Sequence, residues 1–152
     1  MTTISAKSIL ASQHALDPKV RIDTLLLRYP RCIHAEFMTH RVFSRNAASS
    51  RAIPVKKLIE DVLTDPFIPI FWGSNQKGMQ AGEECLMDVE LHSPEFGLSE
   101  CYDRETAWLC ARDQAVMFAK AFAEAGYHKQ LVNRLLERIL ISAQKSAAGR
   151  IH

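Results

Sequence analysis

Residues 21–55 read RIDTLLLRYPRCIHAEFMTHRVFSRNAASSRAIPV, and this stretch contains an apolar run, a helix-compatible run and a polar, cationic run in succession. The first run, 21–30, is rich in β-compatible side chains and closes at a proline, which predicts one buried strand over residues 22–28. Pro30 suits the first turn of a helix, and Ile33 and Phe37 stand four residues apart, which predicts a helix over 31–43. Residues 44–54 then carry the serine, asparagine and proline residues that favour turns.

The segments that follow predict a mainly helical second half. Residues 55–64 repeat Val55, Leu58, Ile59, Val62 and Leu63 at helical spacing and stop before Pro66, which predicts another helix. From residue 66 to residue 101 the prolines and glycines predict a long loop.

Two more helices are predicted after this loop. The first covers 103–126, ends at Gly126 and has an apolar stripe at Trp108, Ala111, Ala115, Phe118 and Phe122. The second starts at 127 and follows Leu131, Leu135 and Leu136. The closing residues, from 142 onward, are small and polar, so we expect them to fray.

Length and composition bound the class of protein. A chain of 152 residues, 47% hydrophobic and 24% charged, predicts a single soluble domain over residues 1–152. One predicted strand beside several predicted helices makes the expected class α+β. The net charge of +2 is too small to favour nucleic acid as a partner. No apolar run reaches the roughly 18 residues of a membrane helix, so we expect no membrane association and a cytoplasmic location. The 4 cysteines lack the spacing of a zinc site, and no metal is expected.

The segment 39–51, THRVFSRNAASSR, concentrates the polar chemistry of the chain. Its serines and Asn46 can donate to an anion, and planar forks that suit phosphate or carboxylate come from Arg41, Arg45 and Arg51. A solvated loop, in which the serines cap helices and the arginines pair with Glu60 or Asp61, is the alternative interpretation. The residues alone leave both interpretations open.

The same segment resembles the signature of flavin-dependent thymidylate synthases, which reads Arg-His-Arg, seven residues and then Ser, with an Asn and a final Arg at fixed offsets. The matching residues are His40, Arg41, Ser44, Asn46, Ser49 and Arg51, and Thr39 stands in place of the first arginine. The likeness extends more loosely from Arg21 to Glu137, through WGSNQKGMQA and GYHKQLVNRLLE, whereas residues 138–152 diverge.

The resemblance implies FAD-dependent methylation of dUMP at C5 to give dTMP, with NADPH and methylenetetrahydrofolate as co-substrates. It also implies an α+β subunit with an antiparallel sheet flanked by helices, and a homotetramer whose active sites form between subunits. The implied cofactor-binding residues are Thr39, His40, Arg41, Asn46 and Ala47. The implied substrate-binding residues are Glu36, Ser49, Ser50, Arg51 and Arg134.

His40 and Ser49 are the implied catalytic residues. We expect Ser49 to bind and polarise the substrate, because no general base stands at an obvious spacing to activate its hydroxyl for attack. Structural interpretations stay open for two of the implied residues. His40 is alternatively a helix-end histidine bonded to Glu36, and Arg134 lies alternatively on a solvated helix face.

Departures from the family pattern support a second hypothesis. Thr39 removes a cation, Ala47 stands where many members have a carboxylate, and the family's last site segment does not follow residue 137. The alternative is therefore a catalytically impaired flavin- or nucleotide-binding remnant, or a partner subunit of the same family. A nucleic-acid binder that uses the arginine-rich turn is a third hypothesis, which the low net charge disfavours.

Overall fold

The computed structural model describes residues 4–47, 49, 51–93, 98–137, 139, 141–147 and 150–151. The first third of the chain contains β1 (Ser5–Gln13), β2 (Arg21–Pro30), the 3-10 helix η1 (Arg31–Ile33), α1 (His34–Thr39) and β3 (Ser44–Arg45). The remainder contains α2 (Val55–Thr64), β4 (Val89–Ser93), β5 (Leu98–Tyr102), α3 (Arg104–Glu124), α4 (Lys129–Leu136), β6 (Ile141–Ala147) and β7 (Arg150–Ile151).

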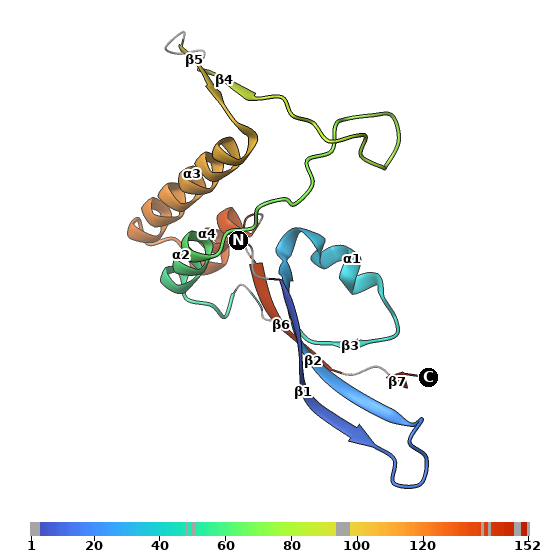
Figure 1. The fold of residues 1–152 in the computed structure, drawn as a ribbon. Helices are drawn as coiled ribbons and strands as arrows, with labels where there is room; N and C mark the ends of the chain where they lie inside the picture. The colour runs from blue at the N-terminus through green and yellow to red at the C-terminus, as the bar shows by residue number, and fades with distance from the viewer. Residues whose placement is uncertain are drawn as a thin grey trace.

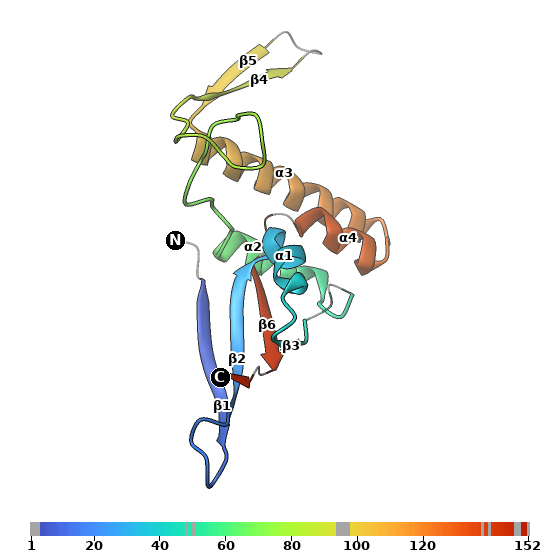
Figure 2. The same ribbon diagram turned by 90° about the vertical axis from the view of Figure 1, so that its right-hand side faces the viewer.

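β2 is the centre of the main sheet. It pairs antiparallel with β1 on one side and with β6 on the other, so that Leu26 lies opposite both Lys7 and Lys145. β3 pairs with the outer side of β6, and β7 pairs with the first residues of β2. Figures 1 and 2 show β1 and β2 as a long twisted ribbon that extends away from the helices. The predicted strand over 22–28, the antiparallel sheet and the α+β class are confirmed, but the strand is half-buried over residues 23–28 rather than buried.

The buried core lies among α2, α3 and α4. Its residues are Leu58, Ile59, Val62, Val116, Ala119, Val132, Leu136 and Ile139. Truncation of a fully buried leucine such as Leu58 costs about 2–5 kcal/mol, because the cavity left behind adds to the lost transfer free energy. Both views place these helices together at the end of the ribbon where β2 stops (Figures 1 and 2). The predicted helix over 55–64 is confirmed, although Leu63 is exposed.

The predicted helix over 31–43 is wrong in its length. The chain forms one 3-10 turn, η1, and then α1, which ends at Thr39. The Thr39 hydroxyl donates to the carbonyl of Glu36 at 2.6 Å, and the N–H of His40 donates to the carbonyl of Phe37 at 3.3 Å. These local bonds compete with continued α-helix, and Ser44 and Arg45 pair with β6 instead.

Three strand regions were not predicted from the sequence. β1 forms at the N-terminal side of β2, and β4 and β5 form a hairpin inside the predicted loop over 66–101. β6 forms in the closing segment, where fraying was expected. Each of these segments is polar or irregular in pattern, and each is held by pairing with another strand rather than by its own propensity.

The helical stripes predicted for α3 and α4 are partly wrong. In α3, Val116 and Ala119 are buried, whereas Phe118 and Phe122 are 52% and 39% exposed. In α4, Leu136 is buried as predicted, but Leu131 and Leu135 are exposed and Val132 and Asn133 turn inward instead. The positive φ of Gly126, 86°, confirms it as the stop signal after α3. Among the described helices, none is both long and apolar enough to cross a membrane.

Candidate nucleotide-binding site

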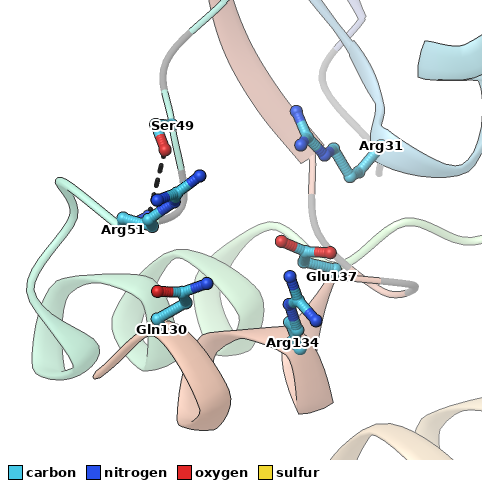
Figure 3. A pocket seen from close by; sticks show the side chains of 6 residues that line it. All are labelled: Arg31, Ser49, Arg51, Gln130, Arg134 and Glu137. Atoms are coloured by element: carbon cyan, nitrogen blue, oxygen red, sulfur yellow. Dashed lines mark hydrogen bonds between the residues drawn. The ribbon is translucent and has the colours of Figure 1, made fainter. Parts of the chain in front are cut away.

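A cavity of about 440 Å³ lies where the end of the sheet meets α4. It is lined by Arg31, Ser49, Arg51, Gln130, Arg134 and Glu137, and we refer to it as the arginine pocket. Figure 3 shows the six side chains around one space, with the Glu137 carboxylate between the Arg31 and Arg134 guanidinium groups in that view.

Three separate parts of the chain supply this lining. Arg31 is the first residue of η1, directly after β2. Ser49 and Arg51 belong to the segment between β3 and α2. The other three residues belong to α4 and its C-cap. Gln130 and Arg134 stand four positions apart and so share one helical face, and Glu137 is the C-cap residue.

Asn133 joins two of these parts. Its side chain is fully buried, and Nδ2 donates to the carbonyl of Ile53 at 3.0 Å. The bond ties α4 to the chain two residues after Arg51. Since Asn133 directly precedes Arg134, α4 turns one side chain into the core and the next toward the pocket.

Ser49 begins a turn that its own side chain supports. The backbone N–H of Arg51 donates to Ser49 Oγ at 3.3 Å (Figure 3), and the N–H of Ala52 donates to the Ser49 carbonyl at 2.9 Å. Because Oγ accepts the backbone bond, its hydroxyl proton can be donated to a ligand.

The pocket is strongly cationic. Three guanidinium groups face one carboxylate, and none of Arg31, Arg51 and Arg134 forms an ion pair with another residue that the structure describes. Carboxylate partners lie within 4.0 Å of four other arginines, namely Arg21, Arg28, Arg104 and Arg112. Three of the described arginines that lack a carboxylate partner therefore meet at one cavity, whereas Arg41 and Arg45 lie elsewhere, and planar forks of this kind suit a phosphate or carboxylate ligand.

The positive charge of Arg31 also acts on the residues beside the pocket. Tyr29 Oη and His34 Nδ1 lie 2.9 Å apart and share a hydrogen bond. Burial, and to a smaller extent the Arg31 charge, lowers the pKa of His34 below its ordinary value. Burial raises the pKa of Tyr29, which the same charge opposes. Both shifts favour the neutral forms, so this pair adds no compensating charge to the pocket.

The structure brings together three of the residues that the sequence proposed for substrate binding. Ser49, Arg51 and Arg134 line the pocket, although more than 80 residues separate the first two from the third in the sequence. Glu36 is exposed on α1 and does not line it. Ser50 lies outside the described residues.

The residues proposed for cofactor binding lie outside the arginine pocket, along the chain from the end of α1 to just beyond β3. Thr39, His40, Arg41 and Asn46 are exposed, and Ala47 is half-buried. The Thr39 hydroxyl is already bonded to the Glu36 carbonyl. Within the described residues no bond joins the side chains of Glu36 and His40.

The solvated-loop alternative required the loop arginines to pair with Glu60 or Asp61. Arg45 instead donates from Nη1 to the carbonyl of Phe37 at 3.0 Å. Among the described residues, neither acidic side chain forms an ion pair with these arginines.

Sequence reasoning missed Arg31, Gln130 and Glu137 as pocket residues. Gln130 and Glu137 stand four residues before and three residues after Arg134, so helical spacing alone places them on its face. Arg31 has no such signal, because its place in the pocket depends on where β2 ends in the fold.

No family model matches the sequence, and no curated protein matches it. Among solved structures, the chain is similar to the UMP/dUMP methylase PolB from Streptomyces cacaoi, crystallised with 5-Br UMP. The superposition has a TM-score of 0.65 and 14% sequence identity, and it covers 98% of this chain and 72% of that chain. The two proteins share a fold.

Proposed function

We propose that this protein binds dUMP, or a closely related pyrimidine nucleoside monophosphate, in the arginine pocket and methylates it at C5. The single observation that carries the proposal is that three guanidinium groups, none of which forms an ion pair with a described residue, converge with Ser49 around one cavity. Two further facts support it. The residues concerned include Ser49 and Arg51 of the motif that resembles flavin-dependent thymidylate synthases, and a protein of the same fold is a UMP/dUMP methylase.

The chain's own residues supply binding and orientation. Arg51 and Arg134 hold the phosphate, because charge-assisted, bidentate bonds both attract and align it. Ser49 donates its hydroxyl proton to the nucleotide, and the amide of Gln130 can both donate and accept. Fixing the nucleotide in this way lowers the entropy cost of bringing its ring to a second reactant.

The proposed cofactor is FAD, with NADPH and methylenetetrahydrofolate as co-substrates. The exposed donors His40, Arg41 and Asn46 fit an anionic cofactor, since each carries at least one N–H group and two of them are cationic or can become so. FAD, when bound, supplies the redox chemistry that the transferred one-carbon group requires. Thr39 and Ala47 fit less well, because neither brings a charge.

Two variants separate the proposed nucleotide and flavin sites. His40→Ala should reduce the flavin retained on purification and leave dUMP binding in place, whereas Ser49→Ala should weaken dUMP binding and retain flavin. Flavin absorbance and calorimetric titration with dUMP measure the two separately. If neither variant changes either ligand, the segment is a structural turn and the proposal fails.

A second candidate is a non-catalytic flavin- or nucleotide-binding subunit of the same family. Thr39 favours this second candidate, because it replaces a cation and its hydroxyl already donates a hydrogen bond to the backbone of α1. Formation of dTMP from dUMP, with the three cofactors supplied, distinguishes the candidates. An enzyme forms it, and a remnant binds dUMP without turnover unless a complete subunit is added.

Self-association is part of the proposal. Large apolar side chains on α3, on α4 and between them are exposed, and the rings of Phe122 and Tyr127 contact each other; these side chains are Met117, Phe118, Phe122, Tyr127, Leu131 and Leu135. Large exposed apolar surfaces of this kind mark contacts with other chains. A homotetramer that covers these side chains agrees with active sites shared between subunits.

A further inference from the structure

Arg31 lies on the opposite side of the arginine pocket from α4 and belongs to neither of the motifs used above (Figure 3). We propose that Arg31 is a third ligand of the nucleotide phosphate and closes the pocket from the side of the sheet. The inference rests on the proposed nucleotide-binding function and assigns a further residue to the same site.

The backbone of Arg31 is held in a fixed place. The two residues before it, Tyr29 and Pro30, are buried at the end of β2. The carbonyl of Arg31 accepts a hydrogen bond from the N–H of His34, which closes the η1 turn. Only the side chain remains to be ordered, so binding a ligand costs little backbone entropy here.

The chain treats two nearby arginines differently. Arg28, three residues earlier, donates from Nη2 to Asp65 Oδ2 at 2.6 Å and so has a carboxylate partner within the protein. Arg31 forms no ion pair with any residue that the structure describes, yet its charge reaches the Tyr29–His34 pair. A half-buried arginine without an ion pair among the described residues is ordinary by itself, but Arg31 faces a cavity that two more arginines line.

The charge balance of the pocket supports the same assignment. With Arg31 included, three cationic side chains face one carboxylate, an excess of two positive charges. A phosphate monoester carries about −1.5 to −2 charges at pH 7. Without Arg31 the excess is a single charge, because Glu137 offsets one of the two guanidinium groups that remain. The third arginine therefore matches the pocket to a dianion.

Glu137 adds selectivity for a ligand with a single phosphate group. Its carboxylate points into the same space, so it repels any second anionic group placed beside the first (Figure 3). A carboxylate also accepts hydrogen bonds from sugar hydroxyls. The pocket thus favours a monophosphate with a neutral sugar and base over a diphosphate.

The test compares Arg31→Gln with Arg21→Gln as a matched control. Arg21 lies at the far end of β2, about 30 Å away along an extended strand, and its ion pair with Asp23 is on the surface. Affinity for dUMP is measured by calorimetry, and affinity for deoxyuridine, which lacks the phosphate, by ligand-observed NMR at millimolar concentration. Arg31→Gln should weaken dUMP about 10- to 100-fold, the usual effect of a bond between charged groups, and leave deoxyuridine unchanged. Arg21→Gln should leave both unchanged.

Each other outcome is decisive. If the wild-type protein binds dUMP but Arg31→Gln binds it equally well, the assignment of Arg31 is wrong and the proposed function stands. Equal weakening of dUMP and deoxyuridine shows that Arg31 shapes the pocket without contacting phosphate, which also overturns the assignment. Failure of the wild-type protein to bind dUMP refutes the proposed function itself. Should Arg31→Gln unfold, Arg31→Lys serves as the second variant, because lysine keeps the positive charge but loses the planar guanidinium group. A partial loss of dUMP affinity in Arg31→Lys supports the assignment. Wild-type dUMP affinity in this variant contradicts it.

Discussion

Replacement of Asn133 by alanine tests how α4 and the segment between β3 and α2, which both line the pocket, are held together. The Nδ2 donor of Asn133 is the bonding partner of the Ile53 carbonyl at 3.0 Å, and the asparagine is fully buried. Loss of the donor leaves that carbonyl without this bond in a partly buried place, which costs about 1–3 kcal/mol. For a domain of this size each kcal/mol lowers Tm by about 2–4 °C, so we expect Tm to fall by about 2–12 °C.

The substitution should also weaken dUMP binding in protein that is still folded. Ser49 and Arg51 lie on the segment that Asn133 fastens to α4, while Arg134 stays on the helix itself. Looser positioning of two phosphate or sugar contacts lowers affinity, because more conformational entropy is lost when the ligand binds. Thermal unfolding and calorimetry with dUMP at 25 °C measure the two effects.

Asn75→Ala is the matched control, since Asn75 is exposed in the loop between α2 and β4. It should change neither Tm nor dUMP affinity. The reasoning is refuted if Asn133→Ala keeps Tm within about 1 °C of the wild type, because a buried carbonyl that loses its donor cannot be neutral unless another donor replaces it. If Tm falls but dUMP affinity is unchanged, Asn133 supports the core alone and does not position the pocket.

Three further predictions follow from the site and the surface. Arg51→Ala and Arg134→Ala should each weaken dUMP binding at least about tenfold with Tm unchanged, since truncating one partner of a desolvated charged bond costs about 2–5 kcal/mol; wild-type affinity in either variant removes that arginine from the site. Phe118→Glu, which charges the exposed surface of α3, should shift the protein toward monomer in sedimentation velocity, and an unchanged distribution would show that other chains do not cover this surface. The lowered pKa of His34 means that the unfolded chain binds its proton more readily, so stability should fall as the pH drops through the ordinary histidine range near 6.5; His34→Gln should lose that part of the pH dependence of Tm.

The sequence predicted those elements whose pattern is local. The apolar run of β2 and the helical spacing of Leu58, Ile59 and Val62 each decide a structure without help from distant residues. The strands β1, β4, β5 and β6 escaped prediction because their stability comes from pairing. β6, for example, is recognisable only once β2 is known to lie beside it.

The candidate site divides in the same way. The motif proposed Ser49 and Arg51 from the sequence. Gln130 and Glu137 could have been added, because helical spacing places them on the same face of α4 as Arg134. The position of Arg31 in the pocket depends on where β2 ends relative to α4, and no local sequence pattern predicts that arrangement. The stripe predicted along α3 failed for a related reason: Phe118 and Phe122 are as apolar as core residues, but the described chain covers them only in part, Phe122 through its ring contact with Tyr127.

The composition of the arginine pocket is itself an argument for a ligand. Grouping three like charges around one cavity opposes folding, because they repel each other and the single carboxylate offsets only one of them. The described arginines outside the pocket show that the chain can supply carboxylate partners, as Asp65 does for Arg28. An anion that bridges η1, the segment before α2 and α4 would relieve the repulsion and bind only the folded arrangement. Stability should therefore rise with ligand concentration as RT ln(1 + [L]/Kd), about 2.7 kcal/mol at 100 Kd, so the thermal shift caused by dUMP measures its affinity for the folded pocket.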